Sequence, residues 1–424
     1  MKIKNILTIV VSLALVAGIA CSAAACTNGS DNKKPSGRTH DRETHVINGS
    51  SDNKTIHHNF VNGKCTMCDE TTIFRQDAMS KSPEILLTEQ SKRGTVEYFW
   101  YETRAYGVEE KLANGEMAKP AEYKDGDELW IKKRAYVYLP CGYNKEDTSK
   151  KYNVLYMMHG DKLNEGYWFR TGAYSDPGQH SAYTGGYGTE NMLDYMYGNN
   201  LIEDTIFVAM TMYQYYNGEY SGDDANPNYV GGNDAQGNIY SGYKVPEKDL
   251  GYSTGVGIDN EGTDTVYWKE WRYHLMPYVV ENFNTYAASA SEEDLIAARD
   301  HVGFTGLSRG GASVCSVIDN CLKYISYFAY ESNWYRVGDS QIKTIKDNAN
   351  AYPVNYMFLS CGSQEDPEEN DRVMLKIKNE LGWNEGSDIK GGDKISFIQV
   401  NGTAHNYATW ITNLYNLMLV FFKK

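Results

Sequence analysis

From about residue 93 onward, the apolar positions follow two patterns, one typical of strands and one typical of helices. Uninterrupted apolar runs at 152–160 and 204–212 predict strands that are buried on both faces. The earlier segments "GTVEYFWYET" and "KKRAYVYLP" predict two strands that pair antiparallel. Apolar side chains at helical spacing predict an amphipathic helix over 264–286, namely Trp268, Trp271, Leu275, Val279 and Phe283.

Later segments continue the alternation of strands and helices. "HVGFTG", "YFAYES", "VNYMFLSC" and "KISFIQV" predict four more strands, and a final helix carries Trp410, Leu414, Leu417, Met418 and Phe421 on one side. Strands that alternate with helices predict an α/β fold, with a mostly parallel central sheet covered by helices on both faces.

The first 26 residues predict an export signal. Two lysines precede a short apolar run, which is followed by small residues and two cysteines. The contexts of Cys21 and Cys26 resemble a lipobox, so residues 1–26 are expected to be a lipoprotein signal peptide, with a lipid anchor in the membrane at one of these cysteines. Plain secretion after cleavage is the alternative. Both interpretations export the protein, either to the bacterial cell surface or to the medium.

Two short regions separate this signal from the main domain. Residues 27–56 are polar with almost no apolar side chains, which predicts a disordered linker. Residues 57–75 form a small Cys/His segment. Two thiolates and two imidazoles satisfy tetrahedral zinc, so a structural zinc site is one interpretation, with ligands His57, His58, Cys65 and Cys68. A disulfide between the two cysteines, or two free thiols, is the other.

Composition and charge exclude one class of partner. The chain of 424 residues is 41% hydrophobic and 23% charged, as in ordinary globular proteins, and its formal net charge is −14. This charge repels phosphate backbones and no basic stripe offsets it, so nucleic acid is not an expected partner.

A serine between two glycines follows one of the predicted strands. In "HVGFTGLSRGGASV" the strand leads into a Gly-x-Ser-x-Gly pentapeptide, and a helix follows at once. Strand, turn and helix in this order are the context of a nucleophile elbow, in which Ser308 sits on a strained turn. Side chains at Gly306 or Gly310 would collide with the adjoining elements. The pattern therefore predicts Ser308 as a nucleophile.

The same chemistry needs a base and an acid. His405, in "VNGTAHNYATW", lies between the last strand and the final helix and is the only histidine after Ser308. We therefore expect His405 to be the base, with a loop histidine that caps the helix as the alternative. The acid is expected in the loop "GSQEDPEEND". Counting from the strand end favours Glu365 or Asp366, with a preference for Asp366, whose shorter side chain is more easily fixed.

An oxyanion pocket needs two backbone donors. The first expected donor is the N–H of Arg309, which follows the nucleophile. The second is expected after the strand in "MMHGDK", at Gly160 or Asp161. His159 in the same turn is interpreted as a structural residue, because the site already has a base.

The insertion at 213–262 carries eight tyrosines among Gly, Asn and Asp. Aromatic faces stack on sugars and phenolic rings, so a tyrosine of this insertion, Tyr213, is a candidate for substrate binding. A loop without such a role is the alternative.

Several segments together resemble a known family. "YVYLPCGYN", "YNVLYMMHG", "WRYHLMPYVVENF", "GFTGLSRGGASV" and "GTAHNYATW" are similar to an esterase family of α/β-hydrolases, particularly its feruloyl esterases and acetylxylan esterases. The resemblance spans residues 93–424. It implies an α/β-hydrolase fold and hydrolysis of ester substituents on plant cell-wall polysaccharide, with no cofactor for catalysis.

The resemblance also assigns residues. It implies Ser308 as nucleophile, His405 as base, the Arg309 amide in the oxyanion hole and Trp334 as a wall of the pocket. A place in the core is the alternative for Trp334. Two positions depart from the family. Arg309 stands where methionine is frequent, and the family's spacing in the acid loop falls on Glu365. The expected activity is that of a feruloyl esterase acting on xylan. An acetylxylan esterase or a catalytically silent glycan-binding lipoprotein is the alternative.

Overall fold

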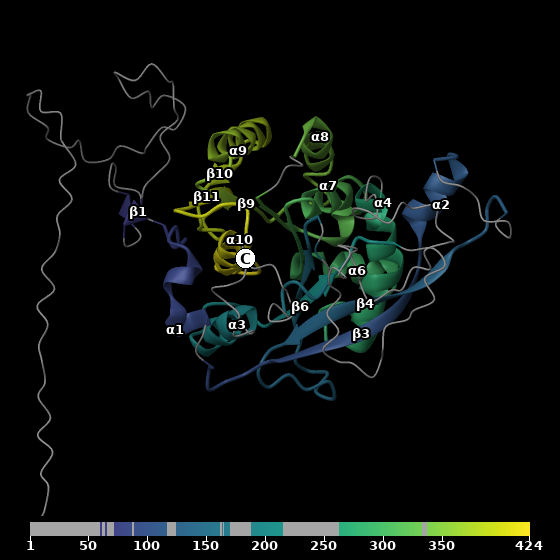
Figure 1. The fold of residues 1–424 in the computed structure, drawn as a ribbon, viewed down its shortest axis with the longest axis horizontal. Helices are drawn as coiled ribbons and strands as arrows, with labels where there is room; N and C mark the ends of the chain where they lie inside the picture. The colour runs from purple at the N-terminus through teal and green to yellow at the C-terminus, as the bar shows by residue number, and fades with distance from the viewer. Residues whose placement is uncertain are drawn as a thin grey trace, which may run out of the picture.

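A computed structural model describes residues 60–61, 64–65, 72–86, 89–116, 124–161, 163, 165–169, 188–214, 263–332 and 337–424. Among these residues, nine strands form one central sheet (Figure 1). Their order across the sheet is β10 (Asn384–Glu385), β11 (Asp393–Val400), β9 (Tyr356–Gly362), β8 (Tyr327–Glu331), β7 (Val302–Leu307), β5 (Asn153–Met158), β6 (Thr205–Met210), β4 (Trp130–Leu139) and β3 (Thr95–Arg104).

The sheet is mostly parallel, as the sequence predicts. The seven strands from β10 to β6 run parallel to one another. The β4 strand joins β6 in the antiparallel sense, and β3 pairs antiparallel with β4 from Thr95 opposite Leu139 to Arg104 opposite Trp130. The predicted antiparallel pair is thus confirmed, and it forms one end of the sheet.

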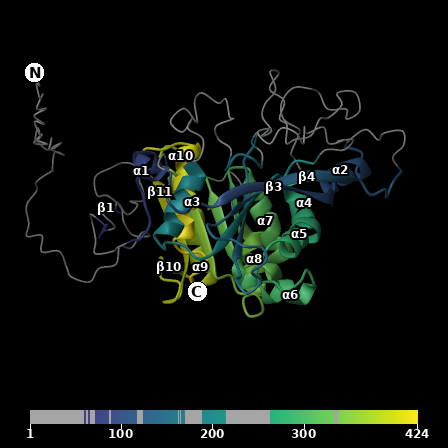
Figure 2. The ribbon, with the colours of Figure 1, turned by 90° about the horizontal axis from the view of Figure 1, so that it is seen from below.

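Helices cover both faces of the sheet (Figure 2). Side chains of β5 alternate between the two, because Val154 and Tyr156 join one hydrophobic cluster while Leu155 and Met157 join the other. One face packs against α4 (Thr263–Glu270), the π-helix η3 (Trp271–Leu275), α5 (Met276–Asn282), α6 (Glu292–Ala297), α7 (Gly310–Cys321), α8 (Asp339–Asp347) and α9 (Pro367–Leu381). The opposite face packs against α1 (Pro83–Leu86), α3 (Gly188–Gly198) and α10 (Tyr407–Met418).

Two further parts stand apart from these layers. The α2 helix (Tyr106–Ala113) follows β3 and packs beside α4, and the short strands β1 (Phe60–Val61) and β2 (Lys64–Cys65) pair antiparallel. Three 3₁₀ turns complete the described elements, at η1 (Met79–Lys81), η4 (Arg299–His301) and η5 (Leu322–Tyr324).

The segment 72–86 is tied to α10. The Arg75 amide donates to Asn416 Oδ1 at 2.7 Å, and Asn416 Nδ2 donates back to the Arg75 carbonyl at 2.7 Å. The Met79 amide donates to Thr412 Oγ1 at 2.8 Å. Apolar side chains of this segment also enter the core beside α10, namely Phe74, Met79, Ile85 and Leu86. The packed unit therefore includes residues on the amino side of position 93, where the sequence placed the domain boundary.

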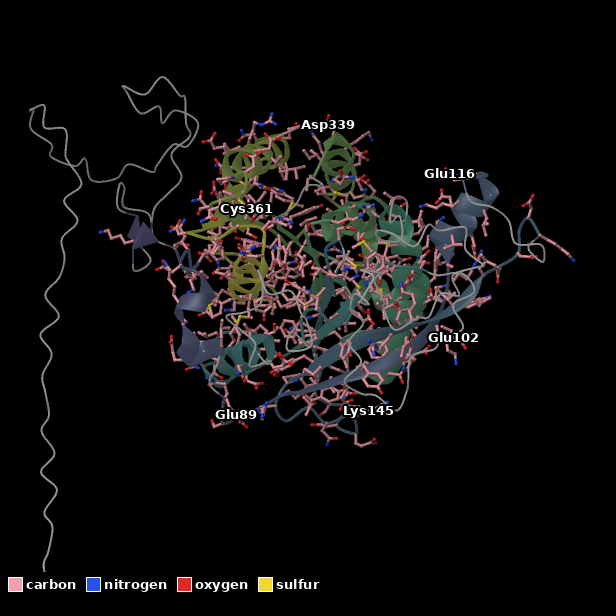
Figure 3. The ribbon with its side chains drawn as sticks, viewed as in Figure 1. Glu89, Glu102, Glu116, Lys145, Asp339 and Cys361 are labelled. Carbon is pink, nitrogen blue, oxygen red and sulfur yellow. The ribbon has the colours of Figure 1, made fainter. Side chains whose placement is uncertain are left out.

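Charged side chains such as Glu89, Glu102, Glu116, Lys145 and Asp339 lie around the periphery (Figure 3). A pair on β4 and α4 departs from this pattern. Lys133 Nζ lies 2.6 Å from Glu270 Oε1, and both side chains are fully buried. Tyr101 and Gln214 donate further hydrogen bonds to the Glu270 carboxylate. Buried charges are tolerated when they are paired and hydrogen-bonded, as here.

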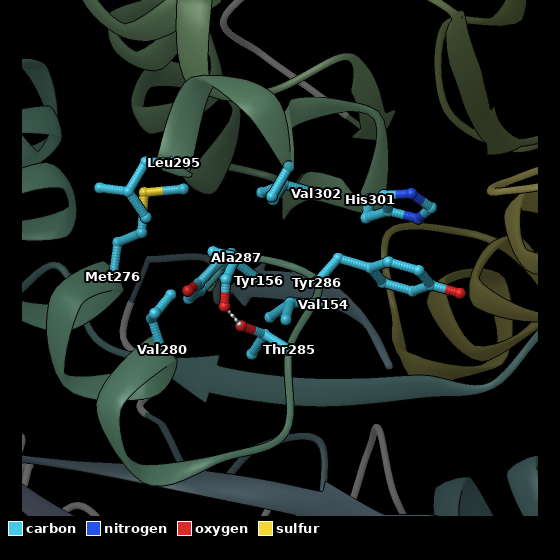
Figure 4. Close-up of a pocket in the computed structure, with 11 residues that line it drawn as sticks. Val154, Tyr156, Met276, Val280, Thr285, Tyr286, Ala287, Leu295, His301 and Val302 are labelled. Atoms are coloured by element: carbon cyan, nitrogen blue, oxygen red, sulfur yellow. Dashed lines mark hydrogen bonds between the residues drawn. The ribbon is translucent and has the colours of Figure 1, made fainter. Parts of the chain in front are cut away.

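A small apolar pocket opens at the amino ends of β5 and β7 (Figure 4). The Tyr286 ring stacks on His301 at its rim, with ring centroids 3.4 Å apart. The pocket is lined by Val154, Tyr156, Met276, Val280, Thr285, Tyr286, Ala287, Leu295, Ala298, His301 and Val302. Ligands of open α/β sheets bind at the carboxyl ends of the strands, so this pocket lies at the edge opposite the expected site.

No helix among the described residues is both long and apolar enough to cross a bilayer. The predicted signal peptide at 1–26 and linker at 27–56 lie outside the described residues and stay predictions.

Candidate active site

The predicted elbow forms between β7 and α7. Ser308 follows the last residue of β7 and has φ +51°, a left-handed conformation that is uncommon for residues other than glycine. Its amide donates to the Glu331 carbonyl at 2.8 Å, and its carbonyl accepts from the Gly311 amide at 3.1 Å. These bonds hold the strained turn from the neighbouring strand and from the first turn of the helix.

Glycine is required on both sides of Ser308, at Gly306 and Gly310, because other backbone segments pass very close to these two residues. A β carbon at Gly306 would stand 2.3 Å from the Gly310 carbonyl oxygen. A β carbon at Gly310 would stand 2.6 Å from the His159 carbonyl oxygen. Real β carbons do not approach backbone atoms this closely, so each position accepts only glycine unless the backbone shifts.

His405 links the serine to a carboxylate. Its Nε2 lies 2.8 Å from Ser308 Oγ, and its Nδ1 lies 2.7 Å from Glu365 Oε2. Asn406, directly after the histidine, caps α10 by accepting from the first amides of the helix. The Trp410 ring meets the imidazole edge to face at 5.2 Å between centroids. The helix start and this ring together fix the direction of the imidazole.

The Glu365 carboxylate holds one tautomer of this histidine. An ionised carboxylate only accepts hydrogen bonds, so the proton between Glu365 and His405 belongs to Nδ1. The Nε2 atom then carries a lone pair, and the Ser308 hydroxyl donates to it. The arrangement is ready to take the serine proton.

The structure contradicts the preference for Asp366. The Glu365 Oε1 atom accepts from the Gly362 amide at 2.5 Å and from Ser332 Oγ at 2.8 Å, while Oε2 faces the imidazole. Asp366 is exposed and serves as the N-cap of α9, accepting from the Glu369 amide at 3.2 Å. The capping position directs the Asp366 side chain to the helix start rather than to His405.

The loop after β5 lies against the elbow. A β carbon on Gly160 would stand 2.9 Å from the Ser308 β carbon, so this backbone passes directly beside Ser308. Asp161 is exposed, and Arg309 is half-buried at the start of α7. The structure therefore brings together the two segments that the sequence assigned to the oxyanion pocket.

His159 fixes the peptide between Gly160 and Asp161. Its ring Nδ1 lies 2.6 Å from the Gly160 carbonyl oxygen, and Nε2 lies 2.8 Å from Thr211 Oγ1. Burial lowers the pKa of His159 to about 3, so the ring is neutral. The carbonyl can only accept, so Nδ1 carries the proton and Thr211 donates to Nε2. Because the peptide is planar and trans, the Asp161 N–H points away from His159.

A second acid, which the sequence did not single out, lies beneath the elbow. Glu331 ends β8 and is fully buried, with Thr305 Oγ1 donating to its Oε1 at 2.5 Å. Burial raises the pKa of Glu331 to about 8. Its Oε2 is buried and has no hydrogen-bond partner within the part of the chain that the structure describes. Glu331 is therefore protonated at neutral pH.

Other predicted site residues are not brought to this centre. Tyr213 is fully buried, with its ring 4.9 Å from the His159 ring, so it presents no exposed face for stacking on a substrate. That prediction is corrected, because Tyr213 belongs to the core end of the insertion. Trp334 and residues 215–262 lie outside the described residues.

The Cys/His segment is described only in part. Cys65 lies in β2, whereas His57, His58 and Cys68 lie outside the described residues. No group of three or more His, Cys, Asp or Glu side chains that could hold a metal occurs within the described ranges. The zinc site and its alternatives stay predictions.

Sequence comparison finds one curated relative, and no family model matches the chain. The relative is endo-1,4-β-xylanase Y of Acetivibrio thermocellus, which is 29% identical over 224 residues. The aligned part is 53% of this chain and only 15% of the xylanase, so the chain spans a small part of its relative.

Solved structures extend the similarity to most of the fold. The feruloyl esterase module of Clostridium thermocellum, solved as a serine-to-alanine mutant with sinapinate, has a TM-score of 0.54 and 21% identity, covering 84% of this chain and 95% of the module. A structure described as FAE gives a TM-score of 0.56 and 22% identity, with the same coverage. The expected resemblance to feruloyl esterases is confirmed in the fold, which is that of the α/β-hydrolases.

Proposed function

We propose that this protein is a serine carboxylesterase that releases ferulate from xylan. One observation carries the proposal: Ser308 Oγ, the His405 imidazole and the Glu365 carboxylate form a continuous hydrogen-bonded chain, with contacts of 2.8 Å and 2.7 Å. A serine is a weak nucleophile by itself, and this is the arrangement that activates it.

The reaction proceeds in two halves. Ser308 Oγ attacks the ester carbonyl while its proton moves to His405 Nε2, and Glu365 stabilises the imidazolium that forms. The resulting oxyanion accepts hydrogen bonds from the backbone amides of Arg309 and Asp161. When the intermediate collapses, the bond to the sugar oxygen breaks, and that oxygen takes the proton from His405.

Water completes the cycle. It gives a proton to His405 Nε2 as its oxygen attacks the acyl-serine carbonyl, and the second tetrahedral intermediate releases the free acid. Ser308 then regains its proton. The nucleophile, base and acid are all side chains of this chain, so the proposed route draws on no cofactor.

The proposed acyl group and the proposed polysaccharide are inferred from the similar proteins. The structural neighbour is a feruloyl esterase module whose solved form is a serine mutant bound to sinapinate, an aromatic acid. The curated relative is a xylanase. Both support a feruloylated xylan or its oligosaccharides as the partner of this chain.

Hydrolysis of methyl ferulate and of an aryl acetate tests the proposal. We expect the wild type to hydrolyse methyl ferulate with the higher kcat/KM, and Ser308→Ala to lose at least about ten-thousandfold in kcat. Labelling by a fluorophosphonate should occur in the wild type and be absent in the variant. A folded wild type that neither hydrolyses these esters nor labels would overturn the proposal, and a preference for the acetate would favour an acetylxylan esterase.

We also propose that the protein is exported and anchored through a lipidated Cys21 or Cys26. The support is the apolar run with small residues before each cysteine. Metabolic labelling with a fatty-acid analogue in a bacterial host should mark the wild type and be lost in only one of Cys21→Ser and Cys26→Ser. If the wild type is unlabelled and found in the medium, the lipid anchor is excluded and the protein is secreted without one.

A further inference from the structure

A cluster of aromatic side chains at the β3–β4 end of the sheet, away from Ser308, includes two exposed rings among half-buried ones. Trp130, at the start of β4, is 56% exposed, and Tyr273, in η3, is 54% exposed. They are two of the four large hydrophobic side chains that stand exposed within the described ranges. We call this cluster the Trp130 platform, and it consists of Tyr106, Trp130, Trp268, Lys269, Tyr273 and His274.

The rings of the platform are held in place by their contacts. The Trp130 indole donates to Glu128 Oε2 at 3.1 Å and meets the His274 ring edge to face at 5.3 Å between centroids. His274 Nε2 lies 2.9 Å from the Tyr106 hydroxyl. Rings that are fixed before a ligand arrives lose little conformational entropy on binding.

The platform continues from Tyr106 to the second exposed ring. The Lys269 ammonium stands over both Tyr106 and Trp268, 5.8 Å from each ring centroid. Trp268 packs against Tyr273, with 6.1 Å between ring centroids. The α2 and α4 helices lie side by side here (Figure 2), so one surface carries rings from α2, β4, α4 and η3.

Charges around the platform are compensated among themselves. Arg104 pairs with Glu109 at 2.6 Å and with Glu128 at 2.9 Å. The chain as a whole carries −14, but the two carboxylates beside the platform, Glu109 and Glu128, are matched in number by the cations Arg104 and Lys269. Flat rings with hydrogen-bonding groups at their edges fit the apolar faces and hydroxyl rims of sugars. A neutral polyhydroxylated ligand matches this surface, whereas a strongly charged partner finds no surplus of opposite charge there.

The platform and the serine face the same edge of the sheet. Tyr136 of β4 pairs with Ala209 of β6, and the two strands run antiparallel, so Trp130 extends past the carboxyl end of β6. Ser308 follows the carboxyl end of β7, and β5 and β6 lie between β7 and β4. Three strand spacings, roughly 15 Å, separate them across the sheet, and Trp130 also lies five residues beyond the level of Met210, roughly 16 Å along the strand, so the full separation is larger than the lateral one. A polysaccharide chain is long enough to contact both.

We infer that the Trp130 platform is a second binding site, separate from the candidate active site, for a neutral polysaccharide chain of the xylan class. The inference rests on the proposed function for the choice of xylan. A chain held on the platform keeps its ester substituents near Ser308, so the platform raises the local concentration of polymer-borne esters. A small ester such as methyl ferulate, bound at Ser308, is too short to contact the platform as well.

Depletion onto insoluble arabinoxylan tests the inference. The double variant Trp130→Ala/Tyr273→Ala should bind the polymer at least about tenfold more weakly than the wild type, because two stacking faces are lost. Ferulate release from the polymer should fall in proportion at subsaturating polymer, while kcat/KM for methyl ferulate stays unchanged. Trp130→Phe/Tyr273→Phe, which keeps two rings, should retain most of the binding.

Tyr286→Ala is the matched control. Tyr286 is 43% exposed and stacks on His301 at the opposite edge of the sheet, so its loss should leave polymer binding unchanged. The inference is overturned if the wild type does not bind arabinoxylan, if the double variant binds it equally well, or if Tyr286→Ala weakens binding to the same extent. Methyl ferulate hydrolysis tests the proposed function independently of all three results.

Discussion

Ser332 Oγ lies 2.8 Å from Glu365 Oε1 and donates its hydroxyl hydrogen to that carboxylate. Ser332 follows β8 as Ser308 follows β7, and the two serines share a left-handed backbone, with φ +56° and +51°. The second strained turn thus holds the carboxylate that faces the His405 imidazole, while the first holds Ser308, the proposed nucleophile.

Loss of the Ser332 hydroxyl should slow the reaction. Ser332→Ala keeps a β carbon in the strained turn and removes one hydrogen bond to Glu365, so we expect kcat on methyl ferulate to fall about tenfold, with little change in KM. Steady-state kinetics provide the measurement. An unchanged kcat would show that the Gly362 amide alone suffices to hold the carboxylate.

The two neighbouring acids should behave very differently. Glu365→Gln can no longer stabilise the imidazolium, and we expect kcat to fall about a thousandfold or more. Asp366→Asn is the matched control, because asparagine is an equally good N-cap and Asp366 faces away from His405. Its kcat and melting temperature should stay near those of the wild type. The assignment fails if the two variants lose activity to the same degree.

Glycine at the elbow should be irreplaceable. Gly306→Ala forces a methyl group against the Gly310 carbonyl, and we expect a loss of about 3 kcal/mol or more in the free energy of unfolding, together with activity. Gly198→Ala on α3 meets nothing within 4 Å and should be neutral or stabilise by up to about 1 kcal/mol. Urea denaturation of both variants gives the comparison.

The buried acid beneath the elbow predicts a pH dependence of stability. The pKa of Glu331 is about 8 in the folded protein and near 4.5 when unfolded, so between these values the folded state holds one proton more than the unfolded state. Its contribution to stability is therefore complete below pH 4.5 and declines as the pH rises to 8, by up to about 1.4 kcal/mol per unit.

Glu331→Gln isolates this contribution. Glutamine resembles the protonated acid and does not titrate, so the stability of the variant relative to the wild type should increase from pH 5 to pH 8 and then level off. Chemical denaturation at pH 5, 7 and 9 measures it. A difference that does not vary with pH would mean that Glu331 titrates normally.

His159 should act on the rate through the Gly160–Asp161 peptide. His159→Ala frees the carbonyl that the ring now holds, and we expect kcat to fall about a hundredfold with KM nearly unchanged, the loss typical of one oxyanion donor. His159→Asn, whose amide can donate to the same carbonyl, should recover most of the rate. Equal losses in kcat for both variants, or a rise in KM instead, would assign His159 a packing role only.

Most of the sheet could be predicted from apolar runs alone. The run at 204–212 contains β6 (Thr205–Met210), and 152–160 contains β5 (Asn153–Met158), because strands buried on both faces leave an unambiguous signal. The helix predicted over 264–286 appears as α4, η3 and α5 across 263–282. Helical spacing does not distinguish an α-helix from one that widens to a π turn at Trp271.

The choice between the two acids was predictable in principle. Asp366 precedes Pro367 and two glutamates, which is the pattern of an N-cap followed by the first turn of a helix. Reading Asp366 as a cap would have left Glu365 for the imidazole. Ser332 carried no such signal, because its role depends on β8 lying beside β9 in the sheet, and one sequence does not reveal strand order. The sequence does not reveal that Tyr213 is a core residue, because an aromatic residue at the border of an insertion has the same local pattern whether it is buried or exposed.

The bonds between the segment 72–86 and α10 have a mechanical consequence. The α10 helix begins two residues after His405. Its side chains Thr412 and Asn416 accept hydrogen bonds from the backbone amides of Met79 and Arg75. Tension applied to the chain upstream of residue 72 is therefore borne by these bonds together with the hydrogen bond from the Asn401 amide to the Gln76 carbonyl. If the chain is anchored through its amino-terminal side as we propose, these bonds lie between the anchor and the helix that directly follows His405, and their strength sets the force at which the Ser308–His405–Glu365 arrangement is disrupted.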